Sequence, residues 1–326
     1  MKIAVIGTGF ISNMQASFLK NVDGVEIECV MDVKQELVDR YGDEHGVTKR
    51  YTDFDDVLKD ENVDMVYLGV PNFLHYPYAK KALEGGKHVI VEKPFVDTVE
   101  EAQELLNLAK EKDLLIFDAI TTRYMPGLKV LKEKLSDAGK LSMVTTTYAQ
   151  YSHRFDGVRD GNYDRAFDLK YQGGALKDLG IYPVTFNVEL FGAPKDLKYY
   201  PNRLENGCDR SGLIVMEYED FVSTSLVAKD SFMANRCEIT GYDGTFTVDD
   251  DCFRFPNLKF SKSAKQENVE LINTSEKPAH PYEWLEFKDI FEKHDTQRAY
   301  AYIENTMKIM EVMRKLAESA DIRYGE

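Results

Sequence analysis

The first third of the chain alternates short apolar runs with amphipathic stretches. The apolar runs are rich in β-branched and large side chains and are too short for buried helices, so they predict strands. Helical periodicity lies between them, most clearly over residues 99–112, where Thr98 and Glu101 have the spacing of a capping box. Strands that alternate with helices indicate βαβ units and a doubly wound parallel sheet. The predicted strands are residues 3–6, 25–31, 65–70, 88–91 and 114–117, and a further helix is predicted over 76–83.

After residue 123 the pattern changes, because apolar runs follow one another without helices between them. Such runs are typical of antiparallel strands. Asp243 and Gly244 separate two of them, and an Asp-Gly pair favours the positive backbone angles of a type I′ hairpin. The predicted strands are 143–151, 212–218, 221–228, 237–240 and 245–248, and two helices, 282–292 and 298–317, close the chain.

Together these patterns predict an α/β protein of two domains. Residues 1–122 are expected to form a Rossmann domain with a doubly wound parallel sheet. Residues 123–326 are expected to form a second α/β domain with a large, mainly antiparallel open sheet.

Composition and charge narrow the class of partner. The chain of 326 residues carries 41 Lys and Arg against 56 Asp and Glu, a formal net charge of −15 that disfavours nucleic acids and anionic membranes. No apolar run approaches the roughly 20 residues that cross a bilayer. The four cysteines have neither zinc-site nor disulfide spacing, so we expect reduced thiols in a cytoplasmic protein without a bound metal. They are Cys29, Cys208, Cys237 and Cys252.

A glycine-rich turn follows the first predicted strand. Gly7 permits a tight turn, and Gly9 lets backbone amides approach a pyrophosphate at the start of the next helix. The segment continues with Phe10, Ile11 and Ser12, and Ser12 stands where the dinucleotide-binding fingerprint has its third glycine. A small serine still allows close packing of helix on strand.

Asp32 ends the second predicted strand, where an acid can accept hydrogen bonds from the adenosine ribose. Its carboxylate would repel the extra phosphate of NADP, so NAD is the predicted cofactor. NADP remains possible, because Lys34 could receive that phosphate if Asp32 turned away. A solvated turn or helix-cap carboxylate is the alternative interpretation of Asp32.

Polar residues also follow the next predicted strands. Pro71, Asn72 and His75 follow one strand, and Glu92 and Lys93 end the next. The carboxyl ends of parallel strands are where doubly wound folds bind ligands. These residues are therefore candidates for cofactor binding, although a surface ion pair and turn or cap residues would also explain them.

Four motifs in one order carry a resemblance to a known family. They are the glycine turn, residues 71–75, residues 86–94 with Glu-Lys-Pro, and residues 173–183 with Gly-Gly-Ala-Leu-Lys-Asp-Leu-Gly-Ile-Tyr-Pro. Over essentially its whole length the chain resembles the glucose-fructose oxidoreductase, inositol dehydrogenase and MocA family. The resemblance implies an NAD(P)-dependent oxidoreductase acting on sugars, polyols or related small molecules. It also implies a homodimer or homotetramer assembled through the C-terminal sheet.

The resemblance assigns roles to particular residues. Lys93 corresponds to the lysine that contacts substrate near the nicotinamide, and Asp178 and Tyr182 fill the second catalytic segment. Many family members have histidine where this chain has Tyr182. With a tyrosine there, the chain resembles the branch of dihydrodiol dehydrogenase, xylose dehydrogenase and glucose-fructose oxidoreductase more than the inositol dehydrogenase branch. Arg165, just before the glycines, is also similar to the former branch.

The chemistry supports these roles independently. Alcohol oxidation needs a base for the hydroxyl proton, and a phenol that ionises near pH ~10 becomes a better base beside an ammonium group. Tyr182 and Lys93 meet this need, while Asp178 could orient the substrate hydroxyl or hold Lys93. A core tyrosine with a cap aspartate is the alternative. Pro183 is expected to bias Tyr182 away from helical geometry.

Further candidates flank the predicted cleft. Arg123 could reach cofactor or substrate, or form an ion pair in the domain linker. His153 could face the substrate, and His75 could line the nicotinamide pocket or cap a helix. Trp284 more often indicates packing than stacking on a sugar. We therefore predict an NAD(P)-dependent oxidoreductase with a Lys/Tyr/Asp acid–base group; a non-enzymatic NAD(P) sensor on the same fold is the alternative.

Overall fold

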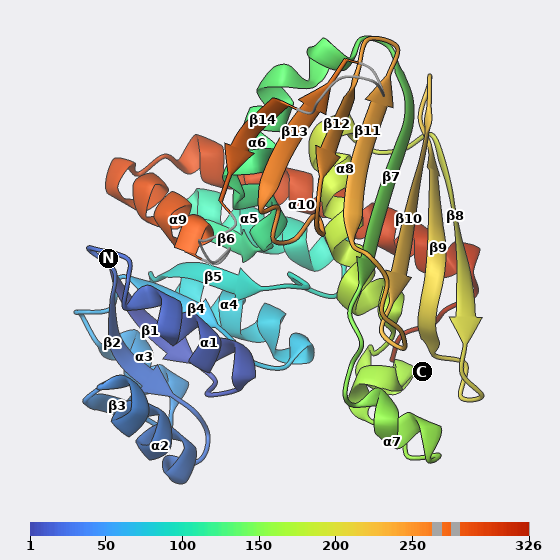
Figure 1. Ribbon diagram of the computed structural model, residues 1–326. Helices are drawn as coiled ribbons and strands as arrows, with labels where there is room; N and C mark the ends of the chain where they lie inside the picture. Colours follow the sequence, from blue (N-terminus) through green and yellow to red (C-terminus); the bar gives the residue numbers. More distant parts are fainter. Residues whose placement is uncertain (263–268, 275–280, 326) are drawn as a thin grey trace. The chain divides into compact units, whose positions relative to one another are not determined.

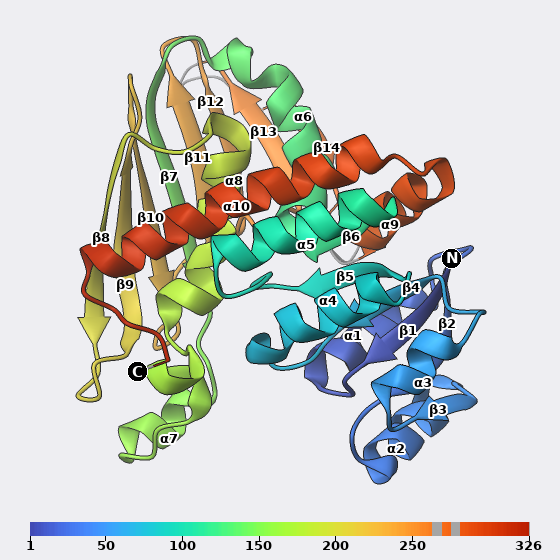
Figure 2. The ribbon, with the colours of Figure 1, turned by 180° about the vertical axis from the view of Figure 1, so that it is seen from behind.

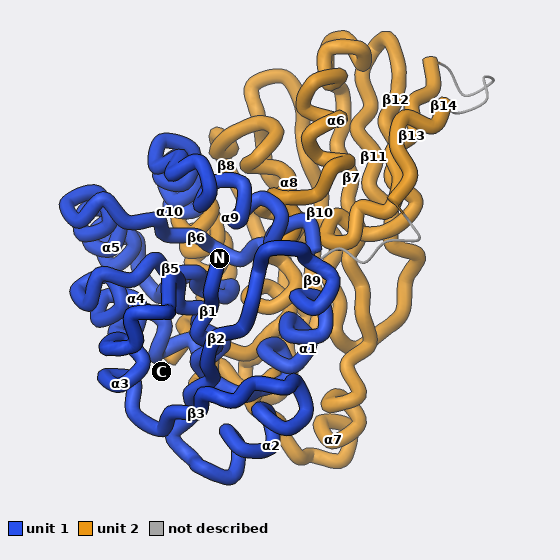
Figure 3. Tube along the Cα trace, turned by 90° about the vertical axis from the view of Figure 1, so that its left-hand side faces the viewer, with its two compact units in different colours: residues 1–120, 280–307 blue, residues 121–279, 308–326 orange. Residues whose placement is uncertain are grey.

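The computed structural model describes residues 1–262, 269–274 and 281–325, and the chain forms two compact units (Figure 3). The first unit comprises Met1–Ile120 and His280–Met307, and the second comprises Thr121–Ala279 and Lys308–Glu326. The sequence pattern predicted a single domain for residues 123–326. The compact units instead group the segment 280–307 with the N-terminal sheet, so the chain returns to its first unit near its end.

The sheet of the first unit is parallel throughout and has the strand order β3-β2-β1-β4-β5-β6 (Figure 1). The doubly wound prediction is therefore confirmed. Strand β3 was not predicted, because it has only three residues and two of them are Lys49 and Arg50. The strands are β1 (Lys2–Ile6), β2 (Glu26–Met31), β3 (Lys49–Tyr51), β4 (Met65–Leu68), β5 (His88–Glu92) and β6 (Ile116–Ala119).

Helices cover both faces of this sheet. Helix α1 contacts α2 and α9, and α4 contacts α5 on the other side of the strands (Figure 3). The predicted capping box of α5 is present, since Thr98 accepts from the Glu101 amide and Glu101 accepts from the Thr98 amide. The helices are α1 (Phe10–Leu19), α2 (Gln35–His45), α3 (Phe54–Lys59), α4 (His75–Glu84), α5 (Val99–Lys112) and α9 (Pro281–Lys293), with a short 3₁₀ helix at Asn72–Leu74.

The sheet of the second unit has eight strands in the order β14-β13-β12-β11-β7-β10-β9-β8. Strands β7 and β10 are parallel and the other neighbours are antiparallel, which confirms the mainly antiparallel prediction. The strands are β7 (Leu141–Ala149), β8 (Asp196–Arg203), β9 (Asp209–Glu217), β10 (Val222–Ala228), β11 (Arg236–Gly241), β12 (Thr245–Val248), β13 (Asn257–Ser261) and β14 (Val269–Asn273).

Helices of the second unit pack on this sheet, with α8 against β7 and α6 against β13 and β14 (Figures 1 and 2). A π-helical turn, Leu176–Gly180, leads directly into α8. The α-helices of this unit include α6 (Pro126–Lys134), α7 (Phe155–Arg159) and α8 (Ile181–Phe191). Short 3₁₀ turns lie at Thr121–Tyr124, Leu135–Ala138, Arg165–Phe167 and Leu169–Tyr171. The unit boundary falls within the last helix, α10 (Thr296–Ser319). Within the described ranges no helix is long and apolar enough to span a membrane.

The predicted hairpin is present, but its predicted turn type is wrong. Thr240 pairs with Thr245 across β11 and β12, so Tyr242 and Asp243 form the centre of the turn. Neither they nor Gly244 has the positive φ that a type I′ turn requires. Gly244 is needed for space instead, because a Cβ there would lie 2.4 Å from the Phe260 ring.

All four cysteines are free thiols, as predicted, and all four are buried. Burial raises the pKa of the Cys29 and Cys208 thiols to about 12, which disfavours the reactive thiolate. They therefore contribute small apolar side chains to the core.

Candidate active site

The glycine turn after β1 has the geometry that its sequence predicts. Gly7 has φ +88°, and a Cβ there would lie 2.6 Å from the carbonyl oxygen of Gly69 at the end of β4. The Gly7 amide donates a hydrogen bond to the Met31 carbonyl oxygen at 2.8 Å. Only glycine fits this position, since both the backbone angle and the neighbouring strand exclude a side chain.

The start of α1 is suited to hold a phosphate group. Gly9 is the N-cap and supplies no side chain to the first amides, and the first turn contains no acidic residue. A Cβ on Gly9 would meet no described atom within 4 Å, so the backbone is open to a ligand. Phe10 is 84% exposed and Ile11 is half-buried beside it. These features fit the pyrophosphate of a dinucleotide at a helix N-terminus.

Ser12 occupies the position of the third glycine of the fingerprint, and the structure shows how the serine is accommodated. It is buried, and a Cβ on Gly69 would lie only 2.2 Å from its Oγ atom. The absent side chain at Gly69 therefore makes room for the serine on α1. The close helix–strand approach is preserved, with the glycine on the strand instead of the helix.

Asp32 lies directly after β2 and faces the glycine turn. Its Oδ2 atom accepts hydrogen bonds from the Thr8 amide at 3.1 Å and the Thr8 hydroxyl at 2.8 Å. The carboxylate is thus held beside the turn. Its role toward the cofactor ribose stays a prediction, and Thr8 is a partner that the sequence did not indicate.

A cavity of about 280 Å³ lies in the first unit near the end of β2. Its mixed apolar and polar lining and its position after a parallel strand suit the adenine ring of a dinucleotide. None of the lining residues was predicted as a site residue, because they come from the ends of β2 and β3 and from the helices α3 and α4. The lining residues are Met31, Val33, Thr52, Asp53, Phe54, Pro77, Tyr78 and Lys81.

The segment after β4 is braced by His75. Pro71 is the N-cap of the 3₁₀ helix that begins at Asn72, and His75 is the first residue of α4. The buried His75 ring has Nδ1 at 2.9 Å from the Pro94 carbonyl oxygen and Nε2 at 3.0 Å from that of Val70. Burial lowers the pKa of His75. This bracing role is observed, whereas a place for His75 in the nicotinamide pocket stays a prediction.

Glu92 belongs to a buried polar network instead of projecting freely from β5. Its Oε1 atom accepts from the Tyr67 hydroxyl at 2.7 Å and from Gln15 Nε2 at 3.4 Å. Gln15 also donates to Glu283 at 2.7 Å and accepts from Trp284 Nε1 at 2.8 Å. Trp284 is fully buried against Tyr67, as the packing interpretation predicted.

Burial and a second carboxyl group of this network, that of Glu283, change the protonation of Glu92. Burial, and then the nearby Glu283 carboxylate, raise the pKa of Glu92 to about 7. The Lys93 amide donates to Glu92 Oε2 at 3.2 Å, so the network lies directly behind Lys93. Lys93 is half-buried and its bond to Pro94 is cis. Direct cofactor binding by Glu92 stays a prediction.

In the second unit, Asp209 organises the segment that follows the two glycines. Gly174 has φ +119°, and a Cβ there would lie 2.1 Å from Asp209 Oδ1. The buried Asp209 accepts from the Leu176 amide at 2.6 Å and from the Tyr199 hydroxyl at 2.7 Å. Burial raises the pKa of this carboxyl. Asp209 thus fixes the start of the π-helical turn that carries Asp178.

Asp178 forms an ion pair that the sequence did not reveal. Its Oδ2 atom lies 3.0 Å from Nζ of Lys229, the residue directly after β10. The lysine side chain is buried, whereas the side chain of Asp178 is 44% exposed. The carboxylate is therefore held from behind by a buried cation and remains open toward solvent.

Tyr182 is the second residue of α8, so the expected departure from helical geometry is wrong. Pro183 is the third residue, in the first turn, where a missing amide removes no bond of the α-helix. The preceding π-turn is of a kind that is frequent at functional sites. Tyr182 is largely buried and packs on Tyr148 and Phe253, with ring centroids 5.4 and 4.9 Å away.

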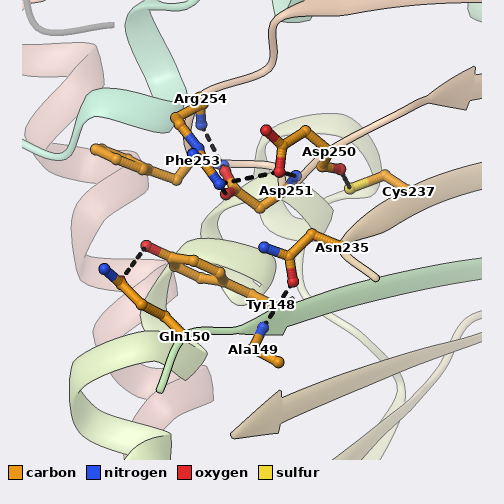
Figure 4. Close-up of polar contacts among 9 residues, drawn as sticks. All are labelled: Tyr148, Ala149, Gln150, Asn235, Cys237, Asp250, Asp251, Phe253 and Arg254. Carbon is orange, nitrogen blue, oxygen red and sulfur yellow. Dashed lines mark hydrogen bonds and ion pairs between the residues drawn. The ribbon is translucent and has the colours of Figure 1, made fainter. Parts of the chain in front are cut away.

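The loop that carries Phe253 is fixed by Asp251 (Figure 4). Asp251 is fully buried, and its Oδ1 atom accepts from the Phe253 and Arg254 amides at 2.9 and 2.7 Å. Arg254 Nε and Nη2 donate to its Oδ2 atom at 3.0 and 2.8 Å. The aromatic wall beside Tyr182 is thus built on a braced loop.

The remaining candidates differ in environment. Arg123 is buried and its Nε donates to Glu189 at 2.6 Å, which favours the structural ion pair over ligand binding. Although burial alone would raise it, the charges of Arg123 and Lys132 lower the pKa of Glu189 to about 2. His153 is exposed beyond β7, and Arg165 is exposed with its guanidinium 4.8 Å from the Tyr171 ring centroid. Both are accessible, and their roles toward substrate stay predictions.

Comparisons with known proteins agree with this architecture. Residues 1–119 match an oxidoreductase family model with an NAD-binding Rossmann fold, and residues 132–247 match the GFO/IDH/MocA C-terminal domain. A scyllo-inositol 2-dehydrogenase (NADP⁺) of Bacillus subtilis (strain 168) is 30% identical over 97% of this chain and 96% of its own. A trans-1,2-dihydrobenzene-1,2-diol dehydrogenase of Oryctolagus cuniculus is 27% identical over 80% of this chain and 79% of its own.

Solved structures show the same fold. A 3-ketoreductase from Actinomadura kijaniata, in complex with NADP and TDP-benzene, has a TM-score of 0.83 and 17% identity, covering 98% of this chain and 97% of its own. The family models and the B. subtilis relative confirm the resemblance drawn from the motifs. The chain therefore belongs to the glucose-fructose oxidoreductase, inositol dehydrogenase and MocA family and is an NAD(P)-dependent oxidoreductase.

Proposed function

We propose that this protein transfers a hydride between nicotinamide and a hydroxyl or carbonyl carbon of a sugar, polyol or dihydrodiol-like compound. Two relatives support this substrate class, because one is named as a scyllo-inositol dehydrogenase and another as a dihydrodiol dehydrogenase. Both names describe vicinal hydroxyl groups on a six-membered carbon ring. A substrate with such a pair of hydroxyl groups is our first expectation.

The proposed acid–base group is Lys93, Asp178 and Tyr182. The observation that carries it is the ion pair of Asp178 with Lys229, which holds a half-exposed carboxylate one turn before Tyr182. A structural cap aspartate would not need a buried ammonium group behind it. The pairing therefore favours a functional carboxylate over the alternative of a cap aspartate with a core tyrosine.

Each of these residues has a separate task in the proposed reaction. A bound nicotinamide supplies the hydride acceptor or donor. Tyr182 takes the hydroxyl proton in oxidation and returns it in reduction, and Lys93 favours the phenolate that forms. Asp178 accepts a hydrogen bond from a substrate hydroxyl and orients the reacting carbon. The aromatic neighbours Tyr148 and Phe253 limit the water that reaches Tyr182.

The experiment is a panel assay with purified protein. NAD⁺ and NADP⁺ are each supplied with cyclic polyols, aldoses and vicinal diols, and reduced nicotinamide is followed by absorbance. We expect turnover with at least one cyclic polyol or diol. Cofactor binding without turnover of any compound would contradict the proposed substrate class and favour a sensor.

We further propose that the second unit pairs with another copy of this chain through its sheet. Tyr200, Leu213 and Leu226 form a row directly opposite one another on β8, β9 and β10. Tyr200 is 55% exposed and Leu226 is 38% exposed. Such a row on an open sheet favours burial against a partner. Leu226→Glu is expected to shift the mass measured by light scattering toward the monomer, and an unchanged mass would contradict this interface.

A further inference from the structure

We propose that Lys229 is a positioning residue that holds Asp178 in its reactive orientation. The inference rests on the proposed function, because it assigns Lys229 a task only if Asp178 takes part in hydride transfer. Lys229 lies at the end of β10, outside the four motifs that carry the family resemblance.

Three contacts fix the Lys229 ammonium group. It lies 3.0 Å from Asp178 Oδ2, donates to the Ala166 carbonyl oxygen at 2.9 Å and lies 4.8 Å from the centroid of the Phe167 ring. The residue is only 3% exposed. A buried ammonium group needs such partners, because removing a charge from water is costly. A movement of the Lys229 side chain away from Asp178 would leave its charge without its carboxylate partner.

The backbone of Lys229 also joins the neighbouring segments. Its amide donates to the Arg210 carbonyl oxygen at 2.9 Å, and its own carbonyl oxygen accepts from the Ser152 amide at 2.8 Å. Ser152 precedes the candidate His153. Lys229 is therefore tied by its backbone to the segment of His153 and by its side chain to the π-turn of Asp178.

A third segment converges on the same side chain. Ala166, whose carbonyl oxygen Lys229 contacts, directly follows the candidate Arg165 on a 3₁₀ turn. Three of the candidate residues of the second unit, His153, Arg165 and Asp178, thus lie on segments that meet at Lys229. This convergence is what a positioning residue requires, since small displacements of reacting groups reduce turnover strongly.

The burial of the two partners shows how the pair works. The cation is shielded, whereas the carboxylate is 44% exposed, so the pair presents one fixed anion. The sequence left open that Asp178 holds Lys93. The ion pair supplies Asp178 with a cation from its own unit, and we assign the exposed side of the carboxylate to the substrate.

The test is a double-mutant cycle in the enzyme, using the substrate found in the panel assay. Lys229→Met and Asp178→Asn are made singly and together, and Lys229→Gln retains a donor for the Ala166 carbonyl oxygen without the charge. Lys140→Met is the matched control, because Lys140 also pairs with a carboxylate but on the exposed surface of the same unit. Thermal melting and cofactor affinity are measured for every variant.

We expect Lys229→Met and Lys229→Gln to lower kcat by about 10- to 100-fold with a smaller change in KM. The factor by which Asp178→Asn lowers kcat should be about tenfold smaller in the Lys229→Met variant than in the wild type. Wild-type turnover in both Lys229 variants, or equal costs of Asp178→Asn in both backgrounds, would overturn the inference. If Lys229→Met does not fold, the same comparison with Lys229→Gln decides.

Failure of the proposed function gives a different result. If Asp178→Asn in the wild-type background keeps full turnover, Asp178 has no part in the reaction and the acid–base assignment fails. If Asp178→Asn is impaired and the Lys229 variants are not, only the positioning inference fails.

Discussion

Substitution of Glu92 by glutamine should remove a pH dependence of stability that the wild-type protein has. The pKa of the folded-state carboxyl is about 7, raised by burial and by Glu283 from an ordinary value near 4.5. Between these values the folded protein binds a proton that the unfolded chain has released. The contribution is thus fully present below about pH 4.5 and is lost as the pH rises through about 7.

The magnitude follows from the size of the shift. A difference of about 2.5 pKa units corresponds to about 3 kcal/mol of unfolding free energy over the whole range. From about pH 6 to about pH 8.5 the loss is about 1.4 kcal/mol, because only the last unit of the shift is crossed. Glu92→Gln stays neutral and should not show this loss.

The assay is urea unfolding at these two pH values, followed by circular dichroism. We compare the unfolding free energy of Glu92→Gln with that of the wild type at each pH. Relative to the wild type, the variant should be about 1.4 kcal/mol more stable at about pH 8.5 than at about pH 6. Glu61→Gln, at an exposed site, serves as the matched control and should show no such change. A difference that is equal at both pH values would refute the protonation of Glu92 in the folded state.

Two further predictions concern the cofactor half of the molecule. Asp32→Ala should raise the ratio of kcat/KM with NADP⁺ to that with NAD⁺ by about 10- to 100-fold, since it removes a repulsion of roughly 1 to 4 kcal/mol; an unchanged ratio in initial-rate assays would refute this role. Gly69→Ala should lower stability by about 1 to 3 kcal/mol through its clash with Ser12, and Ser12→Gly in the same chain should restore much of it. Thermal melting of the single and double variants checks this, and equal losses in both would contradict the packing explanation.

The sequence predicted the strands that consist mainly of large apolar residues. Strands β1, β4 and β5 consist mainly of large apolar residues, and the structure buries most of them in the parallel sheet. Strand β3 escaped prediction because Lys49 and Arg50 give it no apolar pattern. Local periodicity therefore identifies core strands better than short edge strands.

Two local predictions failed because packing outweighed backbone preference. Gly244 allows the Phe260 ring to approach, and its φ is not positive, so the Asp-Gly pair did not determine the turn type. Pro183 was expected to keep Tyr182 out of a helix. It lies instead in the first turn of α8, after a π-turn that the sequence pattern does not show.

The partners of the site residues could not be predicted, because they come from distant parts of the chain. Glu92 shares Gln15 with Glu283, and Asp178 pairs with Lys229. In the sequence Lys229 follows the apolar residues that end β10 and resembles an ordinary solvated residue at a strand end. Only the fold brings its ammonium group to the carboxylate.

We have proposed that Tyr182 moves the proton while the bound nicotinamide exchanges the hydride. We would measure kcat of Tyr182→Phe with the substrate from the panel assay, together with the cofactor dissociation constant by fluorescence. We expect a loss of about 100- to 10,000-fold in kcat with unchanged cofactor binding. A variant that turns over at nearly the wild-type rate would contradict it.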